Sequence, residues 1–246
     1  MATDAVVTAV GRAYRPVNRT MERVFYTGMA LLMCACVYIG FGPTYYNAGL
    51  VHAPLFSPVL QVHGAVFTLW MVLFTTQAVL VAAHRVKWHR TLGTVSFFLP
   101  PLMIVLGTMA AVTALRHGVR IGPLDPATSF AIPMIGLIGF VPVIYFSWAT
   151  RRRPDVHKRL ILIGTAGLVE AAFGRFPWAQ FGVPPAAGAL LGLAFLLVLI
   201  VLYDVVSLRR IHKATMWAVP LTFVMNAVAV PVGMTAVWHQ LAAMLK

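Results

Sequence analysis

Polar and aromatic residues recur at intervals of seven in one apolar stretch, at His63, Trp70, Gln77 and His84. On an α-helix with about 3.6 residues per turn, residues seven apart lie within about 20° of each other. We therefore expect this stripe to face the interior of a helix bundle. Imidazole binds haem iron and other metals, so His63 is a candidate cofactor ligand or part of a proton path. The alternative is a packing face whose polar groups are hydrogen-bonded.

Two further histidines stand in short basic motifs. His89 lies in the run His84–Gly93, which ends in a glycine, and His157 lies in Pro154–Arg159, at the mouth of a later apolar stretch. The eight histidines fall toward both ends of the apolar stretches. Two groups of imidazoles at opposite faces would suit electron transfer across a membrane. The alternative is that loop histidines are simply polar loop residues.

An acid and a base interrupt the apolar stretch Leu160–Gly182. Ionisable residues inside a membrane are costly and are functional candidates by default, which applies to Glu170 and Arg175. The segment Gly174–Pro177 predicts a bend, because proline removes a backbone hydrogen bond, and we expect the bend to line a cavity. Arg175 could hold a carboxylate, such as a haem propionate or an acidic substrate. Alternatively, it forms an ion pair with Glu170 or Asp204.

The last apolar stretch contains two further polar side chains, Asn226 and His239. Together with Gln77 and Glu170, they are the other polar residues that we expect inside the membrane. Asp204 stands directly before a basic segment, and we expect it to pair with Arg209 or Arg210.

The composition requires a membrane-embedded scaffold for these residues. The 246 residues are 60% apolar and 10% charged, whereas soluble domains are near 45–50% and about 25%. Two cysteines exclude a disulfide scaffold. About 20 apolar residues cross a bilayer, and we count seven such stretches: Val24–Gly42, Pro58–Ala83, Thr94–Leu115, Ala131–Ala149, Leu160–Gly182, Ala187–Ser207 and Trp217–Leu245.

The predicted fold is an all-α, integral membrane seven-helix bundle. Residues 1–22 form a polar tail and residues 23–246 a single transmembrane domain. Fifteen Lys and Arg residues fall on the side of the N-terminus and three on the other. Basic loops stay in the cytoplasm, so we expect the N-terminus inside and the C-terminus outside. The formal charge of +13 is spread over these juxtamembrane segments, which argues against nucleic acid and for contact with membrane lipids.

A helix histidine followed by a loop His-Arg-x-Leu-Gly, here His63 and His89–Gly93, resembles several bacterial multi-pass membrane families. It is also loosely similar to b-type cytochromes of the ascorbate- and ferric-reductase kind. The resemblance covers residues 58–175 and implies haem b, one-electron chemistry and a bacterial cytoplasmic (inner) membrane. Those cytochromes draw paired histidines from within facing helices, whereas His157 must reach in from a loop end, so one haem fits better than two.

These observations favour a haem-binding membrane protein that acts in electron transfer, with a quinone as a candidate partner. The expected haem ligands are His63, His89 and His157, with Arg175 as a propionate partner. Three alternatives remain open. They are a binding or transport protein for a small amphiphile at Arg175 and Glu170, an accessory subunit of a larger membrane complex, and a metal-dependent membrane enzyme. A retinal protein is excluded because all four lysines lie in loops or at the C-terminus.

Overall fold

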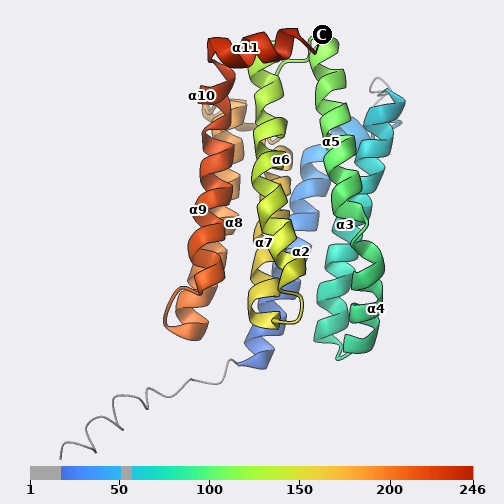
Figure 1. Cartoon of the computed structure of the whole chain (residues 1–246), viewed down its shortest axis with the longest axis vertical. Coiled ribbons are helices and arrows are strands. Elements are labelled where there is room, and N and C mark those ends of the chain that lie inside the picture. The colour runs from blue at the N-terminus through green and yellow to red at the C-terminus, as the bar shows by residue number, and fades with distance from the viewer. Residues whose placement is uncertain (1–17, 51–56, 246) are drawn as a thin grey trace, which may run out of the picture.

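The chain forms an upright bundle of helices (Figure 1). A computed structural model describes residues 18–50 and 57–245, and this part contains helices and turns but no strand. The expected all-α class is therefore confirmed. Residues 1–17, which make up most of the predicted polar tail, lie outside the described part. The first helix already begins at Arg19, so the end of that tail is helical.

Six helices are long and apolar enough to cross a membrane, which supports an integral membrane protein. Most begin with a proline in the first turn or with a side-chain cap such as Asn18 or Asp125, as helix starts commonly do. The six are α2 (Arg19–Phe41, with a π-helical extension Gly42–Tyr46), α3 (Pro58–Ala82), α5 (Leu99–Arg116), α6 (Pro126–Ala149), α8 (Pro185–Leu208) and α9 (Lys213–Ala227) continued by α10 (Ala229–Gly233).

The remaining long helix, α7 (Pro154–Phe173), lies inside the bundle and packs against α2, α6, α8 and α9. It corresponds to the fifth predicted stretch, but it is more polar than the six others because it carries Lys158, Arg159 and Glu170. Small residues allow close packing around it. A Cβ atom on Gly40 of α2, for example, would lie within 2.4 Å of the Ala172 carbonyl oxygen.

The end of α7 corrects one prediction. We expected a bent helix that continues to Gly182, but α7 ends at Phe173 and a turn leads into a short 3₁₀ helix, Trp178–Phe181. Pro177 stands directly before that helix, where its missing N–H breaks no helical hydrogen bond. Arg175 therefore lies beyond the end of α7, and Glu170 lies in its last turn rather than at its middle.

Two predicted spans include segments that are separate helices. The expected loop around His89 is the helix α4 (Val86–Ser96), which packs against α3, and α5 begins only at Leu99. The last span ends at Gly233. The helix α11 (Ala236–Ala243), capped by the Thr235 side chain, lies across one end of the bundle (Figure 1). The expectation that His239 lies within a span is therefore wrong.

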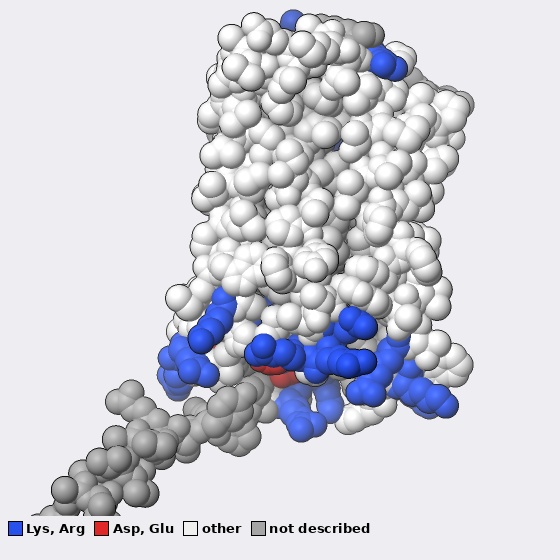
Figure 2. Space-filling view, viewed as in Figure 1, with Lys and Arg blue, Asp and Glu red and all other residues white. Residues whose placement is uncertain are grey.

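Basic side chains gather at one end of the bundle, here called the basic end (Figure 2). The turns that join α3 to α4, α6 to α7 and α8 to α9 all lie there, and α2 begins there. The other end, here called the opposite end, carries α11 and the C-terminus (Figure 1). The basic end has the residues Arg85, Lys87, Arg90, Arg151, Arg152, Arg153, Arg209 and Arg210.

Candidate functional site

The predicted ligands fall into two groups at different levels of the bundle. Helix α3 contains both His63, close to its start, and Gln77, fourteen residues later. At about 1.5 Å per residue these two positions are about 21 Å apart along the helix axis. The side chain of Gln77 contacts His89. The structure therefore separates His63 from His89, and one haem iron cannot take both as axial ligands.

The structure places His89 and His157 within electrostatic range of each other at the basic end. His89 lies on α4 and His157 in the first turns of α7, and both are half-buried. They are close enough for a charge on one to act on the other: burial lowers the pKa of His89, and a positive charge on His157 lowers it further. The two imidazoles are therefore within electrostatic range of each other, and the surroundings of His89 favour its neutral form.

The ring orientation of His157 is fixed by α6. Its Nδ1–H donates to the carbonyl oxygen of Ser147 (2.9 Å), and the Ser147 hydroxyl lies 3.2 Å from the same nitrogen. Because Nδ1 carries the hydrogen, Nε2 keeps its lone pair. A histidine ligand held through Nδ1 by a backbone carbonyl is the common arrangement in metal sites. Ser147 was not among the predicted site residues, because only the packing of α6 on α7 brings it to His157.

The ring of His89 is held by Gln77. With the amide oriented to suit its neighbours, the Gln77 nitrogen donates to the His89 carbonyl oxygen (3.1 Å) and to His89 Nδ1, while its oxygen accepts from the Gly93 N–H (2.9 Å). In that orientation the ring hydrogen of His89 is on Nε2. A half turn of the amide would place the oxygen at Nδ1 and free Nε2 for a metal. Gln77 thus selects the tautomer of His89.

The stripe predicted on α3 is confirmed over most of its length. Trp70 is buried, and its indole N–H donates to the hydroxyl of Thr165 on α7 (3.3 Å). Gln77 faces α4 as described above. His84, by contrast, lies beyond the end of α3 with a positive φ of 62° and contacts Arg23 of α2 at 2.7 Å.

A second group of polar residues, here called the opposite-end cluster, consists of His63, Glu170 and Arg175. The Arg175 guanidinium lies within electrostatic range of both other side chains. Its Cζ is 4.1 Å from the ring centroid of Phe41 on α2. The three residues come from α3, from the last turn of α7 and from the turn after it. Sequence spacing could not predict that His63 joins the other two, because they are more than a hundred positions apart.

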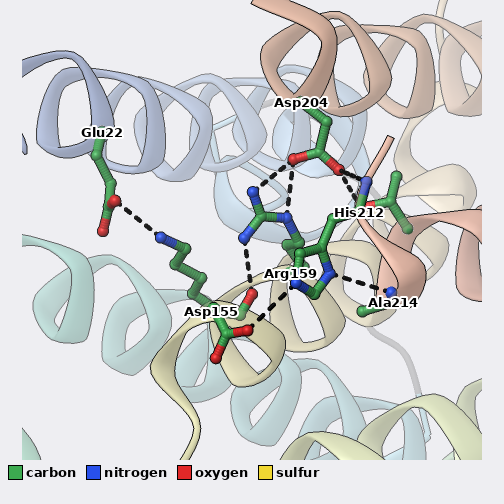
Figure 3. Close-up of polar contacts among 8 residues, drawn as sticks. Glu22, Asp155, Arg159, Asp204, His212 and Ala214 are labelled. Atoms are coloured by element: carbon green, nitrogen blue, oxygen red, sulfur yellow. Dashed lines mark hydrogen bonds and ion pairs between the residues drawn. The ribbon is translucent and has the colours of Figure 1, made fainter. Parts of the chain in front are cut away.

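A third polar group locks α7, α8 and α9 together at the basic end (Figure 3). Arg159 donates to Asp204 Oδ1 from Nε (2.8 Å) and Nη2 (2.6 Å), and both side chains are buried. The expected pairing of Asp204 with Arg209 or Arg210 is therefore wrong. The second Asp204 oxygen accepts from the His212 N–H (3.0 Å) and the Thr215 hydroxyl (2.5 Å). Since every charge is paired, this network is structural.

The remaining predicted polar residues are positioned for packing. Asn226 donates to the Thr222 carbonyl of its own helix (2.8 Å) and lies against Gly136 of α6. His239 is exposed on α11, with Nε2 3.8 Å from Asp125. Among the residues that the structure describes, no group of three or more His, Cys, Asp or Glu side chains is placed to hold a metal ion. Comparisons with family models, curated proteins and solved structures found no match.

Proposed function

We propose that this chain is a haem-binding electron-transfer protein of the membrane, with His89 and His157 as the axial ligands of one haem b. The observation that carries the proposal is that two half-buried imidazoles from separate helices lie within electrostatic range of each other, each contacted at Nδ1 by a neighbouring residue. Haem ligands of this kind bind through Nε2 while Nδ1 is held by the protein. The Nε2 atom of His157 is free for this role, and that of His89 becomes free after a half turn of the Gln77 amide. A bound haem supplies one-electron chemistry.

Several side chains near the pair would support a haem. Arg90 is close enough to His89 to act on it electrostatically, and together with Lys87 it offers cations for the propionates at the basic end. Arg175 lies at the opposite end, so it does not serve this haem. Phe97 and Trp148 stack with ring centroids 3.8 Å apart between the end of α4 and the end of α6. Trp148 directly follows Ser147, the residue that holds His157.

The placement in the membrane extends the same proposal. We infer that α7 is the seventh span, that the basic end faces the cytoplasm and that the membrane is the bacterial inner membrane. Lys and Arg concentrate on the cytoplasmic side of membrane proteins, and the structure gathers them at one end (Figure 2). The charges of α7 are covered by four neighbouring helices, which lowers the cost of a polar span.

The test is the visible spectrum of the protein purified in mild detergent, recorded before and after dithionite. We expect a Soret band that sharpens on reduction, with resolved α and β bands. His89→Leu and His157→Leu should each abolish the bis-imidazole spectrum. His63→Leu and His117→Leu serve as controls and should retain it. A featureless spectrum, also after haem is added, contradicts the function. Loss only in His63→Leu contradicts the choice of ligands.

A further inference from the structure

The opposite-end cluster is poorly satisfied by the protein itself. Glu170 is only 8% exposed, and within the described part of the chain its carboxyl group has no hydrogen bond and no ion pair within 4 Å. The Nδ1 atom of His63 is also buried without a hydrogen-bond partner there. A buried polar group without a partner costs about 1–3 kcal/mol. The Nδ1 atom of His63 is such a group, and it lies in one cluster with Arg175 and the largely buried Glu170, which indicates a ligand that supplies the missing partner.

The arginine is held in place and still accessible. Its Nη1 donates to the Ala171 carbonyl (2.6 Å), which folds the side chain back over the last turn of α7 toward Glu170. Phe41 covers one face of the guanidinium. Within the described part of the chain, the other N–H groups of Arg175 donate no hydrogen bond to the protein, and the residue is exposed. A hydrogen-bond acceptor on a ligand can therefore reach this cation.

The charge balance selects a neutral ligand. Glu170 lies within electrostatic range of Arg175, so an anionic ligand at the arginine would be repelled by the carboxylate. The cluster offers cationic N–H donors on one side and acceptors on the other, namely the carboxylate and His63 Nδ1. A head group that carries both a carbonyl oxygen, as the acceptor, and a hydroxyl group, as the donor, matches these two requirements. Two phenylalanine rings add flat apolar walls. One is Phe41, and the other is Phe67, whose ring centroid lies 4.2 Å from that of His63.

We propose that the opposite-end cluster binds the head group of a membrane quinone or its quinol. The carbonyl oxygen of the head group accepts from Arg175, and in the quinol a hydroxyl donates to Glu170 or to His63 Nδ1. The lipid-facing residues Val62 and Leu69 of α3 are exposed, so an apolar tail can lie along this helix. The choice of a quinone among neutral amphiphiles rests on the electron-transfer function proposed above, but quinone binding itself does not require haem.

The experiment measures binding of decylubiquinol, kept reduced, to the full-length protein in lipid nanodiscs, through quenching of tryptophan fluorescence. Trp178 provides a reporter near the cluster, because its ring stacks with Phe176, two residues before it. We expect saturable binding by the unmodified chain. Arg175→Met, Glu170→Gln and His63→Phe should each weaken it by about tenfold or more. Arg120→Met is the matched control, since Arg120 is an exposed arginine in the loop before α6, and it should leave binding unchanged.

The possible outcomes separate this proposal from the haem proposal. Absence of saturable binding, or equal binding by Glu170→Gln and the unmodified chain, overturns the quinone site. Glu170→Gln keeps the shape of the side chain, so it remains informative if Arg175→Met fails to fold. Competition by decanoate as strong as that by unlabelled decylubiquinol would show a carboxylate site and would also overturn the proposal. Binding with a featureless visible spectrum would support this site while contradicting haem.

Discussion

Arg159 of α7 and Asp204 of α8 form an ion pair that is 2% and 0% exposed, with the closest nitrogen and oxygen 2.6 Å apart. The two side chains of the pair have further partners, since Arg159 Nη1 donates to the Asp155 carbonyl (2.7 Å) and Asp204 accepts from α9 and the turn before it. The pair therefore joins three helices at the level of the basic end. It fixes the position of α7, which carries His157.

Removing one partner of this pair should be strongly destabilising. We expect Asp204→Ala to lower stability by about 3–5 kcal/mol, because it leaves the Arg159 charge buried without a partner. Replacing both residues, as in Arg159→Met with Asp204→Leu, should cost less than the single change. Thermal unfolding in detergent measures both. Asp125→Ala, which removes an exposed helix cap worth about 1 kcal/mol, is the control. If Asp204→Ala loses no more stability than Asp125→Ala, the expected contribution of the buried pair is contradicted.

Stability should fall on acidification through His212, which caps α9. The Ala214 N–H donates to His212 Nδ1 (3.1 Å), so the capping ring is neutral. Burial lowers the pKa of His212, the Arg159 charge lowers it further, and Asp155 opposes this only in part. The unfolded chain therefore takes up the proton first, and the stabilisation is present above about pH 6.5 and lost as the pH falls below it.

The measurement is the unfolding temperature between neutral and mildly acidic pH. His212→Asn keeps a capping side chain but does not titrate in this range, so its unfolding temperature should fall less steeply with acid. Since the pKa of His89 is lowered as well, His89→Leu measured in parallel separates the two contributions. Equal slopes for His212→Asn and the unmodified chain would contradict the role of His212.

The helices were predictable because about 20 consecutive apolar residues have few other folded states. The ends of the helices were harder to predict from the sequence. Hydropathy does not distinguish the residues after Gly233, which form α11 across the end of the bundle, from a continuing span. The turn after Phe173 is apolar as well. Composition reports the environment of a segment, and caps and tertiary contacts decide where each helix stops.

The site was predictable only in part, for a similar reason. The seven-residue spacing correctly placed Trp70 and Gln77 on an inward face of α3. Which groups meet across helices depends on packing that no spacing records. Asp204 pairs with Arg159, forty-five positions away, rather than with the arginines that directly follow it. Arg159 itself was counted only among the basic residues that orient the chain.

Gln77 should tune the affinity for haem. Gln77→Leu removes the amide that donates to His89 Nδ1 and keeps the ring hydrogen on Nε2, so we expect it to raise the affinity for haem. Gln77→Glu presents only acceptor oxygens, which fixes the hydrogen on Nδ1 and leaves Nε2 free. It should therefore bind haem at least as well as the unmodified chain and lower the midpoint potential, because a more basic ligand favours ferric iron. Haem titration and potentiometry test both variants. A matched change in Thr76, which only bonds its own helix, should have no effect.

The crossing of α7 can be tested directly with reporter fusions. Its 20 residues are about 30 Å long, enough for the hydrocarbon core. With Lys158 and Arg159 near the basic end and Glu170 near the other, its charges avoid the middle of the span. We expect a fusion after Arg153 to give fluorescent protein and inactive alkaline phosphatase, and a fusion after Gly182 to give the reverse. A fusion at the C-terminus should behave like the one after Gly182, because α8 and α9 cross the membrane in opposite directions. If the fusions after Arg153 and Gly182 report the same side, α7 does not cross, and the chain has six spans with both ends on one side.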